Sequence, residues 1–102
     1  MSQETEKRIS ELGLCAPRIT PDMIEELIQD IHYWIVPNTT TTICCLVLEN
    51  GFTTIGDSAC VSPENFNEDL GRELAKKEAF HKIYALEGYL LNYKLKQGGV
   101  NQ

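Results

Sequence analysis

The side chains best suited to bind a metal ion or to act as a nucleophile are four cysteines and two histidines. They are Cys15, Cys44, Cys45, Cys60, His32 and His81. Zinc sites use ligand pairs separated by about two to four residues, and none of these cysteines has such a partner. Cys44 and Cys45 are adjacent, so on a strand they would point to opposite faces. We therefore expect free thiols that are buried as small apolar side chains, and no metal site.

The same side chains give little basis for catalysis. A nucleophile needs a positioned base, but His32 and His81 stand far from each other and from the cysteines along the chain. The segment Ser58-Ala59-Cys60 matches no known nucleophile turn. The sequence also lacks a phosphate-binding loop and a dinucleotide-binding glycine motif. We expect a protein that is not an enzyme and that has no cofactor.

Length and composition narrow the class of protein. The chain has 102 residues, of which 42% are hydrophobic, as is typical of a single globular domain. The net charge of −6 argues against non-specific nucleic-acid binding, which depends on neutralising phosphates. No apolar run approaches the ~18–20 residues of a membrane span, and the N-terminus lacks the apolar stretch of a signal peptide. We expect a cytosolic protein without membrane contact.

Two helices are predicted before residue 37. Residues 3–12 form a short polar pattern, and we treat residues 1–19 as a candidate mobile N-terminal segment. Thr20-Pro21-Asp22 is a helix-start signal. After it, apolar residues recur at spacings of four, four and three. These are Met23, Leu27, Ile31 and Trp34. The spacing predicts an amphipathic helix of about 14 residues.

A β-hairpin is the clearest local prediction, with strands over about 40–49 and 52–61. Asn50-Gly51 between the two runs is typical of a type I′ turn. A loop of only those two residues would pair Leu46 with Ile55 and Cys44 with Asp57. Both faces of this hairpin are partly apolar, and a two-stranded hairpin alone is marginal. Helices could cover one face, and a partner subunit could cover the other.

A long helix is predicted from a cap at Asn67 to about Lys96, followed by a polar tail over 97–102. Such a helix would span roughly 43 Å, more than a compact domain of this size needs. Either Gly88 kinks it, or the excess length supports a dimer or larger assembly. The predicted fold is therefore α+β: a hairpin packed with an N-terminal helix and a long C-terminal helix, in an oligomer.

One longer pattern resembles a known family. The string N-G-F-x3-G-x-S-A-C-V-x-P-x-N-F spans Asn50 to Phe66. It is followed by Gly71, Ala75, Ala79, Lys82 and the block 86–91. This pattern resembles a family of small tailed-phage proteins named after gene product forty-nine of phage N-four and gene sixty-six of phage Sf-six. A weaker similarity links the chain to the first Thoeris anti-defence family, whose members are oligomeric sponges for cyclic nucleotide immune signals.

The resemblance implies a phage anti-defence protein in the host cytoplasm that sequesters a cyclic nucleotide without cleaving it. Such a ligand needs cations for its phosphates, flat side chains for its bases and amides for polar edges. The candidate ligand-binding residues are Asn50, Phe52, Asn65, Phe66, Arg72, Lys76, Lys82 and Arg18. Each also has a structural explanation: Asn50 belongs to the turn, Phe52 to a core, and Lys76 to a solvated helix surface.

Two other functions remain open. An acidic inhibitor could bind a host protein directly through a broad negative face. That face would use Glu25, Glu26, Asp30, Glu64, Glu68, Asp69 and Glu73. A modifying enzyme would instead need a perturbed histidine or cysteine in a cleft. A basic and aromatic pocket at a subunit interface would favour the sponge.

Overall fold

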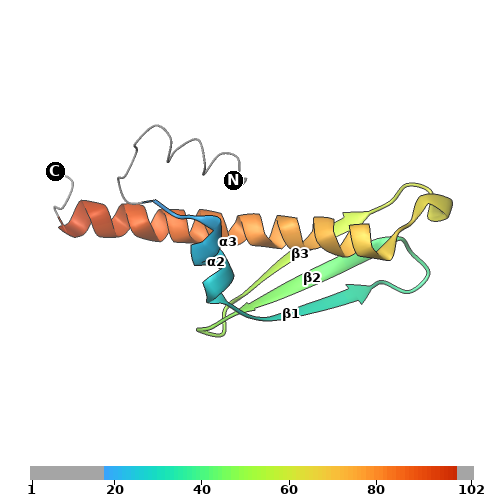
Figure 1. Cartoon of the computed structure of the whole chain (residues 1–102), viewed down its shortest axis with the longest axis horizontal. Helices are drawn as coiled ribbons and strands as arrows, with labels where there is room; N and C mark the ends of the chain where they lie inside the picture. Colours follow the sequence, from blue (N-terminus) through green and yellow to red (C-terminus); the bar gives the residue numbers. More distant parts are fainter. Residues whose placement is uncertain (1–17, 99–102) are drawn as a thin grey trace.

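The computed structural model describes residues 18–98 and shows a three-stranded sheet crossed by one long helix (Figure 1). The elements are α2 (Pro21–Leu27), β1 (Ile28–Ile35), β2 (Thr41–Leu48), β3 (Thr53–Ala59), the short 3₁₀ turn η1 (Pro63–Asn65) and α3 (Glu68–Gly98). The sheet is antiparallel with the strand order β1-β2-β3. The predicted α+β fold is therefore confirmed. The helix expected over 3–12 lies outside the described residues.

The helix after Thr20 is half as long as predicted. It begins as expected, since the Thr20 hydroxyl accepts a hydrogen bond from the Met23 N–H at 3.2 Å. However, α2 ends at Leu27, and the prediction that it extends to Trp34 was wrong because residues 28–35 form β1. Isoleucine and aromatic side chains suit a strand at least as well as a helix. Pairing with β2 supplies β1 with ladder hydrogen bonds that a helix would have made internally.

The hairpin has the predicted strands but a different register. The Gly51 N–H donates to the Leu48 carbonyl at 2.8 Å, and the Leu48 N–H donates to the Phe52 carbonyl at 2.8 Å. The loop therefore has three residues, with Gly51 left-handed at a φ of 91°. Such loops combine a type I turn with a bulge at the left-handed residue. The predicted type I′ register was wrong by one residue, and Cys45 pairs with Ile55 while Cys44 pairs with Gly56.

Gly51→Val should destabilise the protein by about 1–2 kcal/mol, because a β-branched residue is strained at positive φ. A side chain at Gly51 would meet open space, so the loss is conformational and not a clash. Gly51→Asn is the matched control, since asparagine tolerates this region better. Urea unfolding of the two variants measures the difference. Equal stability of Gly51→Val and the unchanged chain would contradict the turn assignment.

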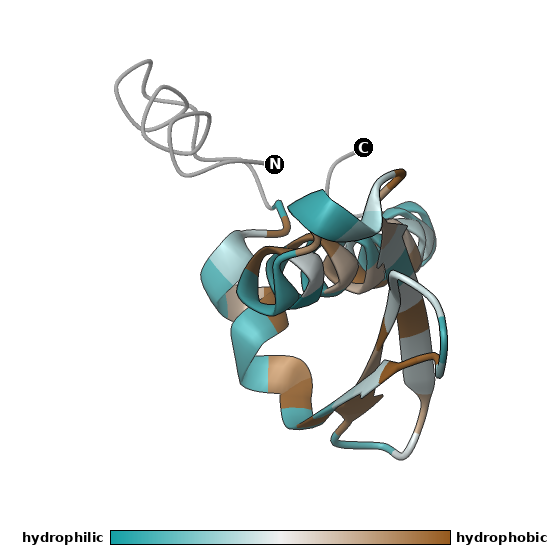
Figure 2. Ribbon diagram, turned by 90° about the vertical axis from the view of Figure 1, so that its right-hand side faces the viewer, coloured by the Kyte–Doolittle hydropathy of each residue, from teal (hydrophilic) through white to brown (hydrophobic). Residues whose placement is uncertain are grey.

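Helix α3 lies closely against β2 and β3 through small residues. Ala75, Ala79 and Ile83 of α3 are fully buried against the sheet. A Cβ atom on Gly56 would overlap the Ala75 carbonyl and lie 2.5 Å from the Ala79 nitrogen. The Thr54 hydroxyl donates to the Ala79 carbonyl at 3.0 Å, and the Ser58 hydroxyl donates to the Gly71 carbonyl at 2.7 Å. Figure 2 shows the resulting layer of helix on sheet, with apolar positions along the strands.

Helix α3 is continuous for 31 residues, through Gly88. Its start is the predicted one, because the Asn67 side chain accepts a hydrogen bond from the Leu70 N–H at 2.9 Å. The C-terminal half extends beyond the sheet (Figure 1). There, Leu86, Tyr89 and Tyr93 remain exposed, whereas Ile19 before α2 is buried in the core. In the described part of the chain, no helix combines the length and apolar character needed to cross a membrane.

Candidate functional site

The open side of α3, toward α2 and β1, carries a group of cations and aromatic rings. Helix α3 packs mainly on β2 and β3, so the α3-facing side of β1 is only partly covered. A hollow of about 250 Å³ lies between α2 and α3. Its lining residues are Glu25, Glu73, Lys76, Lys77, Phe80 and His81. We call this hollow, together with the neighbouring Tyr33 and Arg72, the trough.

Arg72 and Tyr33 form one end of the trough. The guanidinium carbon of Arg72 lies 6.0 Å from the centre of the Tyr33 ring, at the outer limit of a cation–π contact. Arg72 Nη2 lies 2.6 Å from an Asp69 carboxylate oxygen, and Nη1 lies 3.6 Å from Glu68. Both acids belong to the first turn of α3, where the helix dipole favours negative charge. These pairs hold the guanidinium in place and leave its other N–H groups available.

Lys76 and Phe80 continue the same face of α3. Residues four apart on a helix are neighbours, so the spacing aligns Arg72, Lys76 and Phe80. Lys76 Nζ lies 3.7 Å from the Glu25 carboxylate of α2, a partly exposed pair that contributes little stability. Lys77 and His81 make no ion pair with any other residue between 18 and 98. The trough therefore offers a phosphate group the unpaired Lys77, together with Arg72 and Lys76 in pairs with exposed acids, beside the carboxylate of Glu73.

Two ionisable groups beneath the trough prefer their neutral forms. Burial raises the pKa of the Cys44 thiol, and the nearby positive charge of Lys76 opposes that rise. Partial burial also raises the pKa of Tyr33, with a further rise from Cys44 and an opposing effect of Arg72. Cys44 and Tyr33 are paired across β2 and β1. The Cys44 and Tyr33 side chains near the trough are thus uncharged at neutral pH, and its positive charges lie on α3.

Stability should fall in alkaline solution because of the Cys44 thiol. Its pKa in the folded protein is above the ordinary value of 9.0, so the folded state holds the proton more tightly. This stabilisation is complete below pH 9 and is lost as the pH rises through the folded-state pKa. Urea unfolding between pH 7 and pH 11 should show a shallower decline for Cys44→Ala than for the unchanged chain. Identical slopes would contradict the assignment.

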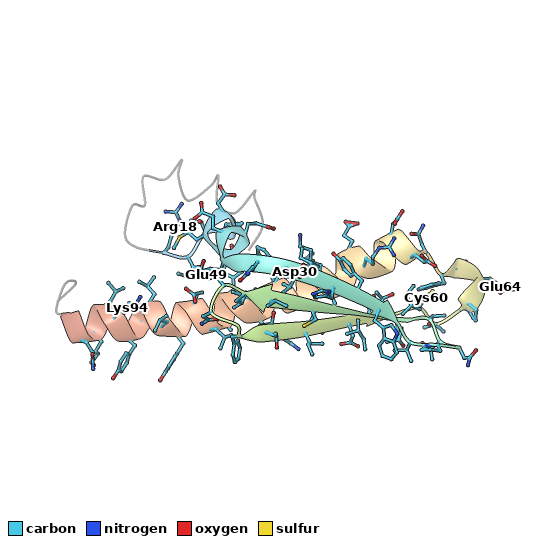
Figure 3. All side chains as sticks on the ribbon, turned by 90° about the horizontal axis from the view of Figure 1, so that it is seen from below. Arg18, Asp30, Glu49, Cys60, Glu64 and Lys94 are labelled. Atoms are coloured by element: carbon cyan, nitrogen blue, oxygen red, sulfur yellow. The ribbon has the colours of Figure 1, made fainter. Side chains whose placement is uncertain are left out.

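The predicted ligand-binding residues do not form a single site. Only Arg72 and Lys76 lie in the trough. Asn65 and Phe66 line a separate hollow of about 60 Å³ near Cys60. Phe52 and Lys82 line an apolar hollow of about 430 Å³ on the opposite side of α3 from the trough. Figure 3 shows Arg18 beside α2, at the other end of the sheet from Cys60.

Several of these residues have structural roles. The Asn50 side chain accepts a hydrogen bond from the Phe52 N–H at 3.0 Å, which stabilises the hairpin loop. Lys82 Nζ donates to the Ile55 carbonyl at the edge of the sheet. Cys44, Cys45 and Cys60 are free thiols, while Cys15 lies outside the described residues. His32 Nε2 lies 3.0 Å from the Asp30 carboxylate on the exposed face of β1.

Sequence reasoning missed Tyr33, Lys77 and Phe80, and considered His81 only as a nucleophile or metal ligand. It placed Tyr33 on a helix, which hid its position below Arg72. The other three follow Arg72 and Lys76 along α3, and the Arg72–Lys76–Phe80 spacing was a signal that could have found the trough. Three of the seven acidic residues named for a broad negative face form ion pairs at the trough. Glu25, Glu68 and Asp69 pair with trough cations.

Comparison with known proteins gives one match. The sequence model of the Phage protein (N4 Gp49/phage Sf6 gene 66) family matches residues 19–95, well over half of the chain. No curated protein and no solved structure matches. The match covers α2, the sheet and most of α3, and so includes every residue of the trough.

Proposed function

Since the chain belongs to the Phage protein (N4 Gp49/phage Sf6 gene 66) family, we propose that it acts during phage infection as an anti-defence protein. In this proposal it sequesters a cyclic nucleotide immune signal in the host cytoplasm and does not cleave it. The trough is the binding site. The similarity to Thoeris sponges stays a prediction, and the residues of the trough support the proposal.

The observation that carries the proposal is the gathering of cations beside aromatic rings on an acidic protein. The chain has a net charge of −6, yet Arg72, Lys76 and Lys77 lie together along one side of α3. Arginine forms bidentate hydrogen bonds with phosphate, and lysine acts as a point charge. Tyr33 and Phe80 offer flat faces against which a base can stack. The hollow and its neighbours Tyr33 and Arg72 therefore offer groups for both phosphate and base recognition.

The size of the trough also bears on the ligand. Pockets for drug-sized molecules usually measure about 300–1,000 Å³, whereas the hollow measures about 250 Å³. One trough thus suits about one nucleotide unit. A cyclic dinucleotide would engage more than one trough, which requires more than one copy of the chain.

A thermal-shift panel of cyclic dinucleotides, cyclic trinucleotides and cyclic ADP-ribose isomers tests the proposal. A ligand at a hundred times its dissociation constant stabilises by ~2.7 kcal/mol. For a domain of this size, that corresponds to a rise in Tm of roughly ten degrees or more. Linear mononucleotides and inorganic phosphate serve as controls. No shift with any cyclic nucleotide would contradict the proposal and favour direct binding of a host protein.

A further inference from the structure

The two edges of the sheet differ in whether side chains from the rest of the chain protect them. The free edge of β3 is protected by side chains of α3. The Asp57 N–H donates to a Glu78 carboxylate oxygen at 3.0 Å, and Lys82 Nζ donates to the Ile55 carbonyl. An exposed strand edge readily pairs with another strand, and charged side chains are a common protection. Helix α3 therefore blocks further pairing at β3.

The edge of β1 has no comparable protection. The Val36 N–H donates to the Thr41 carbonyl, so the alternation of an antiparallel ladder directs Trp34 and His32 toward β2. The peptide groups of Ile31, Tyr33 and Ile35 then point away from the sheet. The Ile31 N–H donates a hydrogen bond to the Asp30 carboxylate at 2.9 Å. Within residues 18–98, the outward peptide groups of Tyr33 and Ile35 have no hydrogen-bond partner.

We propose that β1 pairs antiparallel with β1 of a second copy of this chain, giving one six-stranded sheet in a twofold dimer. Two features fix the centre of the pairing. A register shift between Ile28 and Asp30 interrupts the start of β1, and Pro37, after its end, has no N–H to donate. Pairing is thus limited to residues 31–35, and the twofold axis passes beside Tyr33, the middle one of the three outward-pointing residues. Ile31 then lies opposite the second copy's Ile35, and His32 opposite its Trp34.

Charge and symmetry favour a second copy over another partner. Residues 31–38 contain no Asp, Glu, Lys or Arg, although the whole chain carries −6. Two copies can therefore approach here with less repulsion than elsewhere. The pairing would also cover Trp34, which is 57% exposed, and Tyr33, which is 40% exposed. Because the outer edges of the new sheet would be the protected β3 strands, the assembly closes as a dimer and does not grow into a fibre.

The dimer would bring the two troughs together. In each copy, Tyr33 on β1 lies against Arg72 at one end of the trough. Pairing at Tyr33 would place these two ends side by side, between one α3 helix and the other. The dimer itself does not depend on the proposed ligand, so its test is separate from the thermal-shift panel.

Light scattering of the purified full-length chain tests the dimer. The expected mass is twice the 11.5 kDa of one chain. Ile35→Pro removes an outward N–H, which an edge strand tolerates, along with a half-buried side chain, and should return the mass to that of a monomer. Ile55→Lys is the matched control on the open face of β3, where Ile55 is 50% exposed, and should leave the dimer intact. A monomeric unchanged chain, or a dimer lost only in Ile55→Lys, would overturn the proposal.

Cross-linking provides a second measurement if Ile35→Pro fails to fold. In a pair that exchanges hydrogen bonds, the two Cα atoms lie about 5.5 Å apart, within the range of a disulfide. Tyr33→Cys should therefore form a covalent dimer under mild oxidation. Thr53→Cys, on the protected edge strand, and the unchanged chain with its native cysteines should not. Cross-linking of Thr53→Cys without cross-linking of Tyr33→Cys would contradict pairing through β1.

Discussion

Gly56→Ala should lower the melting temperature by more than about 12 °C, the largest stability effect expected from a single methyl group in this chain. The added Cβ would overlap the Ala75 carbonyl and crowd the Ala79 nitrogen. Both are backbone atoms of α3, so neither can rotate away as a side chain could. Overpacking of a core costs about 1–3 kcal/mol and occasionally more, and each kcal/mol lowers the Tm of a domain of this size by about 4–8 °C. We expect about 3 kcal/mol or more.

Gly88→Ala is the matched control for that measurement. It makes the same change within α3, but a Cβ at Gly88 would have nothing within 4 Å. Alanine is favoured over glycine inside a helix by roughly 0.5–1 kcal/mol, so the Tm should rise slightly. Calorimetry of both variants checks the pair of results. Similar Tm values for Gly56→Ala and Gly88→Ala would show that α3 does not lie as close to β3 as described.

Arg72→Ala should weaken binding of the cyclic nucleotide by about 10- to 100-fold without unfolding the protein. Hydrogen bonds to a charged group contribute roughly 1.5–3 kcal/mol. The substitution also leaves the Asp69 and Glu68 carboxylates unpaired beside the ligand phosphates, which adds repulsion. Both carboxylates are well exposed, so their pairs with Arg72 add little to folding. Calorimetric titration measures binding, and a melting curve checks folding.

Lys94→Ala is the control for Arg72→Ala, since Lys94 lies near the far end of α3 (Figure 3). It removes one positive charge from the same helix and should leave the affinity unchanged. Unchanged affinity in Arg72→Ala would remove the trough from the binding site. Equal weakening by both variants would indicate a long-range charge effect in place of a direct contact.

Local signals predicted much of the fold. Thr20-Pro21 at α2, the strands around Asn50-Gly51 and the Asn67 cap of α3 each depend on a few neighbouring residues, and all are confirmed. The errors arose where contacts between residues far apart in the sequence determine the secondary structure or the strand register. Whether residues 28–35 form helix or strand depends on pairing with β2. The hairpin register depends on whether the loop has two or three residues, and Asn-Gly fits both.

Most residues of the sequence pattern that identified the family pack the fold together and do not belong to the trough. Gly56, Ala75 and Ala79 form the close contact between β3 and α3. Asn50 stabilises the loop, and Lys82 protects the edge of β3. These residues have structural roles, so the pattern identified the family without locating the trough. The trough combines β1 with α3, and a misassigned β1 could not reveal it.

The most direct test of sequestration is to recover the ligand after binding. The protein is incubated with the cyclic nucleotide that gives the largest shift in the thermal panel, freed of unbound ligand by gel filtration and denatured by heat. Mass spectrometry then identifies the released molecule. The proposal predicts an intact cyclic nucleotide in a fixed ratio to protein, and much less of it from Arg72→Ala. Recovery of a cleaved or altered nucleotide would contradict sequestration and indicate an enzyme.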